Sequence, residues 1–315
     1  MSAAGPVLVT GAAGYIGSRV CARLLASGYD VRPVDNFQQA AVDAIGDVPI
    51  ETVDVRDRGA VRAAMDDAAA VIHLAAISGV PDCQADPEAA FDTNVVGTQN
   101  VAWCCREQQV PLVFAGSMAM LGDPTQLPIA ADHPREPLNL YGLTKHMSEV
   151  DVHALAEDAF PAVVLMKSNI YGTHRLDGVE IGKDTVVNIF VDQARRGDPL
   201  TVFTPGTQAR DFIHIDDVAS AYERALAYVC DADPGAETVT IGSGACHSVR
   251  SIAETVQRLA EERLGAAPDI ALVENPRAFE TVAEDFTVET ATATDLLGFT
   301  SERTVEDAVA AMLER

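Results

Sequence analysis

The amino-acid sequence predicts an α/β protein built on a doubly wound parallel sheet, with a second, smaller lobe. Through the first half of the chain, short apolar runs alternate with helical patterns. This alternation is typical of βαβ units, whose parallel strands are buried on both faces. A glycine-rich turn follows the first apolar run, and an acidic residue ends the second. Ligands of such folds bind at the carboxyl ends of the strands, which is where functional residues are expected.

The first predicted strand covers residues 7–10 and leads into Gly11, Gly14 and Gly17, with the spacing G-x-x-G-x-x-G. A helix is predicted over 15–27. Glycines at this position let backbone N–H groups and the positive helix end approach a pyrophosphate. The spacing differs from G-x-G-x-x-G, and such a turn can also serve packing alone.

The second predicted strand, 31–34, ends at Asp35, which lies 24 residues after Gly11. An acid at this place accepts hydrogen bonds from the adenosine ribose hydroxyls and repels a 2′-phosphate, so NAD is expected rather than NADP. A solvated turn acid, followed by Asn36, is the alternative. Together with the glycine turn, Asp35 predicts a Rossmann-type nucleotide-binding domain.

The remaining elements of this domain follow in order. Strands are predicted over 50–53, 70–75, 111–115 and 162–166, and helices over 58–66, 92–108 and 141–157. We assign residues 1–172 to the NAD-binding domain, with a returning segment at about 210–232.

After about residue 172 the alternation of strands and helices becomes irregular, and the predicted strands become short and are separated by loops. We therefore expect a discontinuous α/β substrate lobe formed by residues 173–209 and 233–315. The predicted elements of this half are strands over 200–203, 210–215 and 238–241, and helices over 185–196, 216–229, 248–264 and 304–314.

The composition is strongly acidic. Forty-seven acidic residues face 22 basic ones, for a net charge of −25, and the only lysines are Lys145, Lys167 and Lys183. Self-repulsion of this size is relieved by salt screening, which indicates a salt-adapted (halophilic) protein in a salt-rich cytoplasm. The acids are spread along the whole chain, which argues against one basic partner. Nucleic acid is not expected as a partner, because no basic patch is present.

The six cysteines show neither a C-x-x-C pair nor metal-ligand spacing, and most lie in apolar or helical stretches. Buried free thiols are therefore expected, and no metal site. The sequence shows no signal peptide and no apolar run near the ~18 residues of a membrane span, so neither secretion nor a membrane is predicted.

A candidate catalytic group follows the fifth strand. Ser117 comes directly after an apolar strand, and Tyr141 and Lys145 share one face of the predicted helix at i and i+4. A Tyr-x-x-x-Lys pair alone is commonplace, and Ser117 could simply cap the strand exit. Behind a dinucleotide turn, however, the three residues form a coherent acid–base site.

Several segments together resemble the extended short-chain dehydrogenase/reductases that modify nucleotide-linked sugars, an NAD-dependent epimerase/dehydratase family that includes UDP-glucose 4-epimerases. The resemblance covers nearly the full length. Its matching segments are Thr10–Gly17, Asp54–Asp57, His73–Ala76, Asn94–Thr98, Ser117, Tyr141–Lys145, Asn169–Gly172, Arg210–Ala219 and Ile241–Gly244.

The resemblance implies a role for each matching position. Ser117, Tyr141 and Lys145 would be catalytic, and Ser117, Asn169, Arg210 and Arg277 would bind the nucleotide-sugar substrate. The implied NAD contacts are Gly11, Gly14, Tyr15, Ile16, Gly17, Asp35, Asn36, Asp54, Val55, Leu74, Ala75, Ala76, Asn94, Tyr141 and Lys145.

The chemistry that this implies is transient oxidation at C4 of a sugar, most simply of a UDP-hexose. Lys145 would lower the pKa of Tyr141, whose phenolate removes a hydroxyl proton while hydride passes to NAD⁺, and Ser117 would bond the same oxygen. If the keto sugar turns over before hydride returns, the product is the 4-epimer. If it leaves, the enzyme is a dehydrogenase.

Departures from the family pattern leave alternatives open. Met118 and Ala119 follow Ser117 and cannot transfer protons, which disfavours dehydration and decarboxylation. Lys167 and Ser168 stand where Arg and a larger residue are common. The alternatives to an epimerase are an NAD-dependent sugar or 4-keto-sugar-nucleotide oxidoreductase and a non-catalytic NAD-binding regulatory protein.

The resemblance also implies a homodimer through the helices near 92–108 and 141–157. Trp103 interrupts a helix face that is otherwise expected to be polar. We therefore expect Trp103 at or near such an interface.

Overall fold

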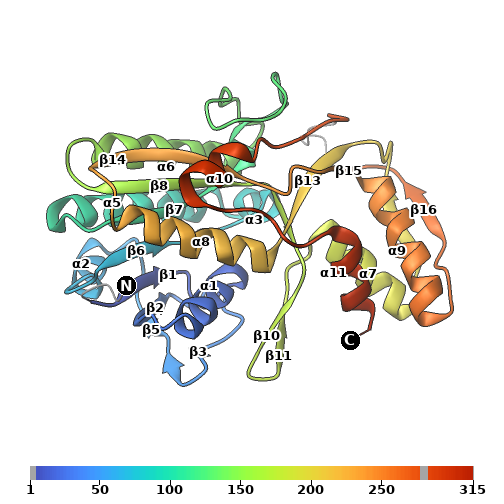
Figure 1. The fold of residues 1–315 in the computed structure, drawn as a ribbon, viewed down its shortest axis with the longest axis horizontal. Coiled ribbons are helices and arrows are strands. Elements are labelled where there is room, and N and C mark those ends of the chain that lie inside the picture. Colours follow the sequence, from blue (N-terminus) through green and yellow to red (C-terminus); the bar gives the residue numbers. More distant parts are fainter. Residues whose placement is uncertain (1–4, 277–282, 315) are drawn as a thin grey trace.

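A seven-stranded, all-parallel sheet is the largest feature of the computed structural model, which describes residues 5–276 and 283–314 (Figure 1). The strands lie in the order β14-β8-β7-β6-β1-β2-β5, so the winding direction reverses between β1 and β6. Their bounds are β1 (Val7–Thr10), β2 (Val31–Asp35), β5 (Glu51–Thr52), β6 (Ala70–His73), β7 (Leu112–Ser117), β8 (Pro161–Lys167) and β14 (Gly235–Ile241). The predicted doubly wound sheet is confirmed, and its ligand crevice belongs at this reversal.

Helices cover both faces of the sheet because successive side chains of each strand point to opposite sides. In β1, Val7 and Val9 enter one hydrophobic core and Leu8 enters the other. The first core is closed by α1 (Tyr15–Ala26), α8 (Ile215–Val229) and α10 (Ala291–Leu297), and the second by α2 (Arg58–Ala64), α5 (Gly97–Gln108) and α6 (Leu140–Ala156).

The helix predicted over 92–108 is a composite. A π-helical turn, η1 (Asp92–Val96), leads into α5. Two short helices that the sequence analysis did not predict precede it, α3 (Val80–Ala85) and α4 (Pro87–Phe91), and a 3₁₀ turn, η2 (Met118–Met120), follows β7.

A smaller lobe lies beside the carboxyl ends of the strands (Figure 1). Its core is formed mainly by α7 (Val186–Arg196), α9 (Val249–Leu264), α11 (Val305–Leu313) and β12 (Leu200–Phe203), and β12 pairs with β16 (Ile270–Val273). A three-stranded sheet has the order β15 (Cys246–Ser248), β13 (Ala209–His214), β9 (Asn169–Tyr171). Two hairpins complete the chain, β3 (Ala44–Ile45) with β4 (Val48–Pro49) and β10 (His174–Leu176) with β11 (Val179–Ile181).

One assignment from the sequence requires correction. The strand predicted over 238–241 was placed in the substrate lobe, but it is part of β14 and pairs with β8 along seven residues. Val239 and Ile241 are fully buried in the same core as Val163 and Leu165, so this pairing extends the main sheet. Helix α10 packs against α8 and β14. Strand β14 therefore belongs to the main sheet and α10 packs against it, although both lie within residues 233–315, which were assigned to the substrate lobe. The other boundaries between the two predicted domains stay a prediction.

Candidate active site

A cavity of about 660 Å³ lies at the carboxyl ends of the central strands. Its walls come from the glycine turn after β1, the end of β2, the loop after β6, the first turns of α6, and Gly182 and Lys183 between β11 and α7. The loops after β1 and β6 meet closely, because the Thr10 hydroxyl accepts hydrogen bonds from the Leu74 and Ala75 N–H groups. The predicted contacts Leu74, Ala75 and Ala76 line the cavity.

The glycine turn allows this close approach. Gly11 has a φ of +71°, and a Cβ on it would lie 2.6 Å from the Ala75 nitrogen. A Cβ on Gly17 would lie 2.0 Å from the Gly11 carbonyl oxygen. Gly14 is the N-cap of α1 and offers no side-chain cap, and the helix N-terminus borders the cavity through Gly14, Tyr15, Ile16 and Gly17. A helix end of this kind fits a pyrophosphate.

Asp35 lines the same cavity at the end of β2. Its carboxylate accepts hydrogen bonds from the N–H groups of Ala13, at 3.0 Å, and Phe37, at 2.8 Å. These bonds fix the carboxylate beside the glycine turn, and its remaining lone pairs fit the hydroxyls of a ribose. The residues present therefore fit an adenine dinucleotide.

Asn36 also lines the cavity, and its amide donates to Asp54 at 3.4 Å. Asp54 itself is outside the lining and forms an ion pair with Arg56 at 2.5 Å. Hydrogen bonding from Arg56 lowers the pKa of Asp54 to about 2. Val55 does line the cavity, backed by Gly97, where a Cβ would lie 2.6 Å from the valine side chain.

Asn94 is buried in η1 and lies outside the cavity lining. Its side-chain oxygen accepts from the Ile77 N–H at 2.8 Å, and its amide donates to the Thr144 hydroxyl at 3.0 Å. Its carbonyl accepts from Ser148 at 2.7 Å. Asn94 therefore fastens the loop after β6 to α6, and it borders the site through Ile77.

Ser117 and Tyr141 meet where α6 begins. Asn139 caps the helix by accepting from the Gly142 N–H at 2.9 Å. A Cβ on Gly142 would lie 2.1 Å from the Ala119 carbonyl oxygen, so only glycine lets α6 start this close to the turn after β7. The start of α6 therefore brings Tyr141 near enough to Ser117 for the serine side chain to act on the pKa of the phenol. Tyr141 lines the cavity, whereas Ser117 is not among the lining residues.

The electrostatics of this group differ from the expectation. Burial raises the pKa of Tyr141, and the hydrogen bond with Ser117 opposes that shift only in part. The lowered pKa implied by the resemblance is therefore not produced by the chain's own groups. Lys145 is 3% exposed, lies 5.0 Å from the centre of the Phe114 ring, and has its pKa lowered by burial to about 8.

The predicted substrate contacts are placed elsewhere. Asn169 lies in β9 and Arg210 in the adjacent strand β13, and neither is among the residues that line the cavity. The Arg210 guanidinium lies 5.3 Å over the Phe286 ring and donates to the Ala209 carbonyl. Arg277 lies outside the described residues.

Two residues of the cavity were not assigned a role from the sequence. Lys167, the last residue of β8, and Lys183 both line the cavity with Lys145, so all three lysines of the chain meet there. Their rarity was the signal that could have found them. Asn188 was missed without such a signal; it holds the chain near Lys183 by donating to the Lys183 carbonyl at 2.9 Å and to the Gly172 carbonyl at 3.0 Å.

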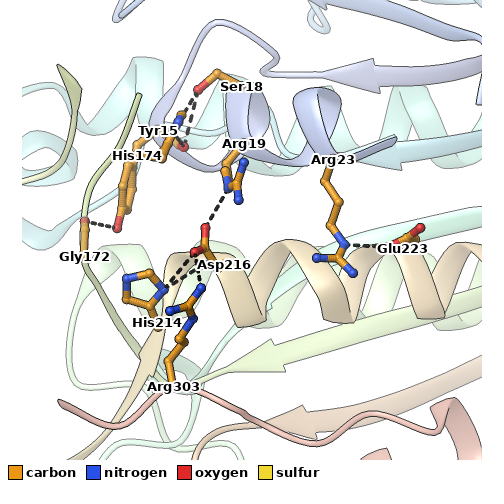
Figure 2. Close-up of polar contacts among 10 residues, drawn as sticks. All are labelled: Tyr15, Ser18, Arg19, Arg23, Gly172, His174, His214, Asp216, Glu223 and Arg303. Carbon is orange, nitrogen blue, oxygen red and sulfur yellow. Dashed lines mark hydrogen bonds and ion pairs between the residues drawn. The ribbon is translucent and has the colours of Figure 1, made fainter. Parts of the chain in front are cut away.

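Polar contacts tie the nucleotide-binding helix α1 to its neighbours (Figure 2). The Tyr15 hydroxyl donates to the Gly172 carbonyl at 2.7 Å, and the Tyr15 and His174 rings are 6.1 Å apart. Arg19 pairs with Asp216 of α8 at 2.7 Å. The helix that borders the cavity is therefore fixed both to the start of the second lobe and to α8.

Other classes of site find no support in the part of the chain that the structure describes. Residues 5–276 and 283–314 hold no cluster of three or more His, Cys, Asp or Glu side chains suited to a metal ion. Across the same ranges, every helix is too short or too polar to cross a bilayer. Four of the free thiols, Cys21, Cys83, Cys104 and Cys105, are buried as predicted, and Cys230 is exposed.

A cavity suited to a dinucleotide, lined by Tyr141 and Lys145 and with Ser117 near the tyrosine, defines the class of protein: an extended short-chain dehydrogenase/reductase with a Rossmann-type fold. A sequence profile of the "NAD dependent epimerase/dehydratase family" matches residues 7–242. The chain belongs to this family, and the family assigned by resemblance is confirmed.

Similar proteins support this assignment. A putative UDP-glucose 4-epimerase of Methanocaldococcus jannaschii is 32% identical over 256 residues, covering 80% of this chain and 81% of that protein. The UDP-glucose 4-epimerase of Bacillus subtilis is 31% identical over 278 residues, covering 80% and 81%. A UDP-glucose-4-epimerase structure from Stenotrophomonas maltophila, with bound NAD and formylated UDP-arabinopyranose, is 27% identical with a TM-score of 0.84, covering 98% and 97%.

Proposed function

We propose that this protein is an NAD-dependent sugar-nucleotide 4-epimerase that acts on a UDP-hexose. The observation that carries the proposal is that Tyr141 and Lys145 line the same cavity as the glycine turn and Asp35. The family membership and the UDP-glucose 4-epimerases among its relatives support the same reaction.

Each residue has a part in this reaction. The N-terminus of α1 would hold the cofactor pyrophosphate, Asp35 the adenosine ribose and Lys145 the nicotinamide ribose. The bound NAD⁺ would supply a reversible hydride acceptor for C4 of the sugar. Tyr141 would take the proton from the C4 hydroxyl, and Ser117 would hydrogen-bond the same oxygen and stabilise the developing carbonyl. Asn169, Arg210 and Arg277 would contact the substrate.

The test uses purified protein in concentrated salt with UDP-glucose or UDP-galactose. Interconversion without added cofactor supports an epimerase that retains its NAD. Stoichiometric accumulation of NADH would instead indicate a dehydrogenase. No turnover, with Tyr141→Phe binding NAD as tightly as the unmodified protein, would indicate a binding role.

We also propose that the protein is a homodimer joined through α5 and α6. These helices pack together, and three of their apolar side chains are accessible: Trp103, Leu143 and Val150 are 37%, 44% and 53% exposed. Apolar side chains gathered on neighbouring helices suit a subunit interface. We expect light scattering to give the mass of two chains, and the double variant Leu143→Asp/Val150→Asp to give the mass of one.

The control for this prediction is Leu272→Asp, in β16 of the smaller lobe. Leu272 is 54% exposed, so the substitution adds a charge at an equally accessible site away from the two helices. This variant keeps the mass of the unmodified protein. A single-chain mass for the unmodified protein contradicts the proposed dimer.

The net charge of −25 leads us to propose a salt-rich cytoplasm as the setting of this protein. Raising the salt concentration from about 0.05 to about 0.5 M shortens the Debye length from roughly 14 to roughly 4 Å and so weakens the repulsion among the acids. We expect the Tm, measured by calorimetry, to rise by several degrees over this range. A Tm that stays constant or falls contradicts salt adaptation.

A further inference from the structure

The three lysines of this acidic chain are gathered in one place, and one of them has no assigned task. Lys145 belongs to the catalytic group, and Lys183 donates to the Ser78 hydroxyl at 2.6 Å. Burial lowers the pKa of Lys183, and the nearby Asp82 opposes this shift only in part. Lys167 is 7% exposed, lines the cavity, and donates to the Gly116 carbonyl oxygen. Its position therefore requires an explanation of its own.

Lys167 is a buried amino group without an anionic partner among the described residues. The charged groups that act on it are Lys145 and Lys183, which are both cations, and together with burial they lower its pKa well below the usual range. Within residues 5–276 and 283–314, Lys167 forms no ion pair with a carboxylate. An uncompensated buried ammonium is costly, and an anion entering the cavity would remove most of that cost.

The place of Lys167 in the sheet indicates whether such an anion would come from the cofactor or from the substrate. Lys167 ends β8, and its Cα is the register partner of Ser117 at the end of β7. The pyrophosphate site after β1 is three strands away from β8, or about 14 Å at ~4.8 Å per strand. The cofactor phosphates are therefore out of reach, whereas the sugar that Ser117 holds lies next to Lys167.

From this arrangement we propose that Lys167 binds a carboxylate on the substrate's hexose, so that the preferred substrate is a nucleotide-linked hexuronic acid rather than a neutral hexose. The inference rests on the proposed function and narrows its substrate class. Ser117 holds the C4 oxygen, and the C6 carboxylate, two carbons along, is the anionic group that can reach the neighbouring ammonium. Met118 and Ala119 offer no proton donor, which is consistent with epimerisation that retains the carboxylate.

The experiment compares UDP-glucuronate with UDP-glucose on the NAD-loaded protein. The dissociation constants are measured by titration calorimetry and kcat/KM by product analysis, for the unmodified protein, Lys167→Met and Lys167→Arg. We expect the unmodified protein to bind UDP-glucuronate more tightly. In Lys167→Met the dissociation constant for UDP-glucuronate rises about 10- to 100-fold, which corresponds to the loss of one charge-assisted hydrogen bond. The dissociation constant for UDP-glucose changes less than about threefold. Lys167→Arg keeps the charge and retains the preference.

Three outcomes overturn the inference. The first is an unmodified protein without preference for UDP-glucuronate, and the second is a preference that survives in Lys167→Met. The third is an equal loss of kcat/KM for both sugars in a Lys167→Met protein whose Tm and NAD affinity are unchanged. That result would mean that Lys167 acts in the turnover of either sugar and does not select the carboxylate. If neither sugar is epimerised, the proposed function fails, and the two dissociation constants still decide the role of Lys167.

Discussion

Replacing Tyr141 by phenylalanine is expected to lower the kcat for UDP-hexose epimerisation by about 10²- to 10⁴-fold, the contribution of a positioned acid–base group. The phenol oxygen is the only heavy atom removed, and it belongs to a side chain that lines the cavity. Burial of the ring is unchanged, so the fold and the cavity are expected to persist. The measurement is single-turnover kinetics on the NAD-loaded variant, with NAD affinity determined in parallel.

The matched control is Tyr29→Phe, which removes the same atom from a tyrosine that packs against the sheet core outside the cavity. This variant is expected to keep its kcat. If Tyr141→Phe retains more than about a tenth of the activity, another group carries the proton, and the assigned base is wrong.

The parts of the fold that local pattern determines were predictable. β1, its glycine turn and Asp35 lie within one βαβ unit. The residues that determine the buried strands and the turn are close together in the sequence, so the local pattern alone predicts them. The same is true of Tyr141 and Lys145, because helical spacing alone places them on one face.

Features that depend on distant segments were not predictable. β14 joins β8 only after the chain has passed through much of the smaller lobe, and nothing in residues 235–241 specifies which sheet they enter. The raised pKa of Tyr141 depends on burial by elements far apart in the chain, whereas the sequence suggested only the nearby cation. The contacts of Asn94 and Lys167 likewise could not be predicted, because they depend on loops and strand ends that only folding brings together.

A buried ion pair supports the segment that leads into the active site. Arg135, in the loop between η2 and α6, pairs with Glu149 of α6 at 2.7 Å, and their side chains are 13% and 6% exposed. The guanidinium also donates to the Ala131 carbonyl at 2.8 Å and to the His133 carbonyl. The Glu149 carboxylate in addition accepts from Thr238 of β14 at 3.1 Å. This pair fixes the loop that reaches Asn139, the N-cap from which the helix of Tyr141 begins.

We expect Arg135→Met to lower the free energy of unfolding by about 3–5 kcal/mol, because it leaves the Glu149 carboxylate buried without its cation. For a chain of 315 residues, with an unfolding entropy of about 2.1 cal/mol/K per residue, that corresponds to a Tm lower by roughly 5–8 °C. The double variant Arg135→Met/Glu149→Met recovers most of the loss, since a well-packed apolar pair often replaces a buried ion pair at little cost. The control Arg258→Met removes an exposed arginine that pairs with Glu262 and Glu306, and it changes stability by less than about 1 kcal/mol.

The pH dependence of the same variant separates charge from packing. Burial alone would raise the pKa of Glu149, but hydrogen bonding and attraction from Arg135 leave it below its ordinary value. A carboxylate with a lowered folded-state pKa contributes stability above its unfolded pKa of about 4.3, and this contribution is lost as the pH falls through the folded-state value. In Arg135→Met, burial raises the pKa of Glu149, so the variant's carboxylate takes up a proton and loses its burial cost as the pH falls toward 4. The difference in unfolding free energy between the unmodified protein and Arg135→Met is therefore expected to be largest near pH 7, to shrink toward pH 4 and to shrink further below it, measured by urea denaturation at constant salt. A difference that is constant across this range would mean that Arg135 supports the loop through its backbone hydrogen bonds and packing, and that the pairing of charges contributes little.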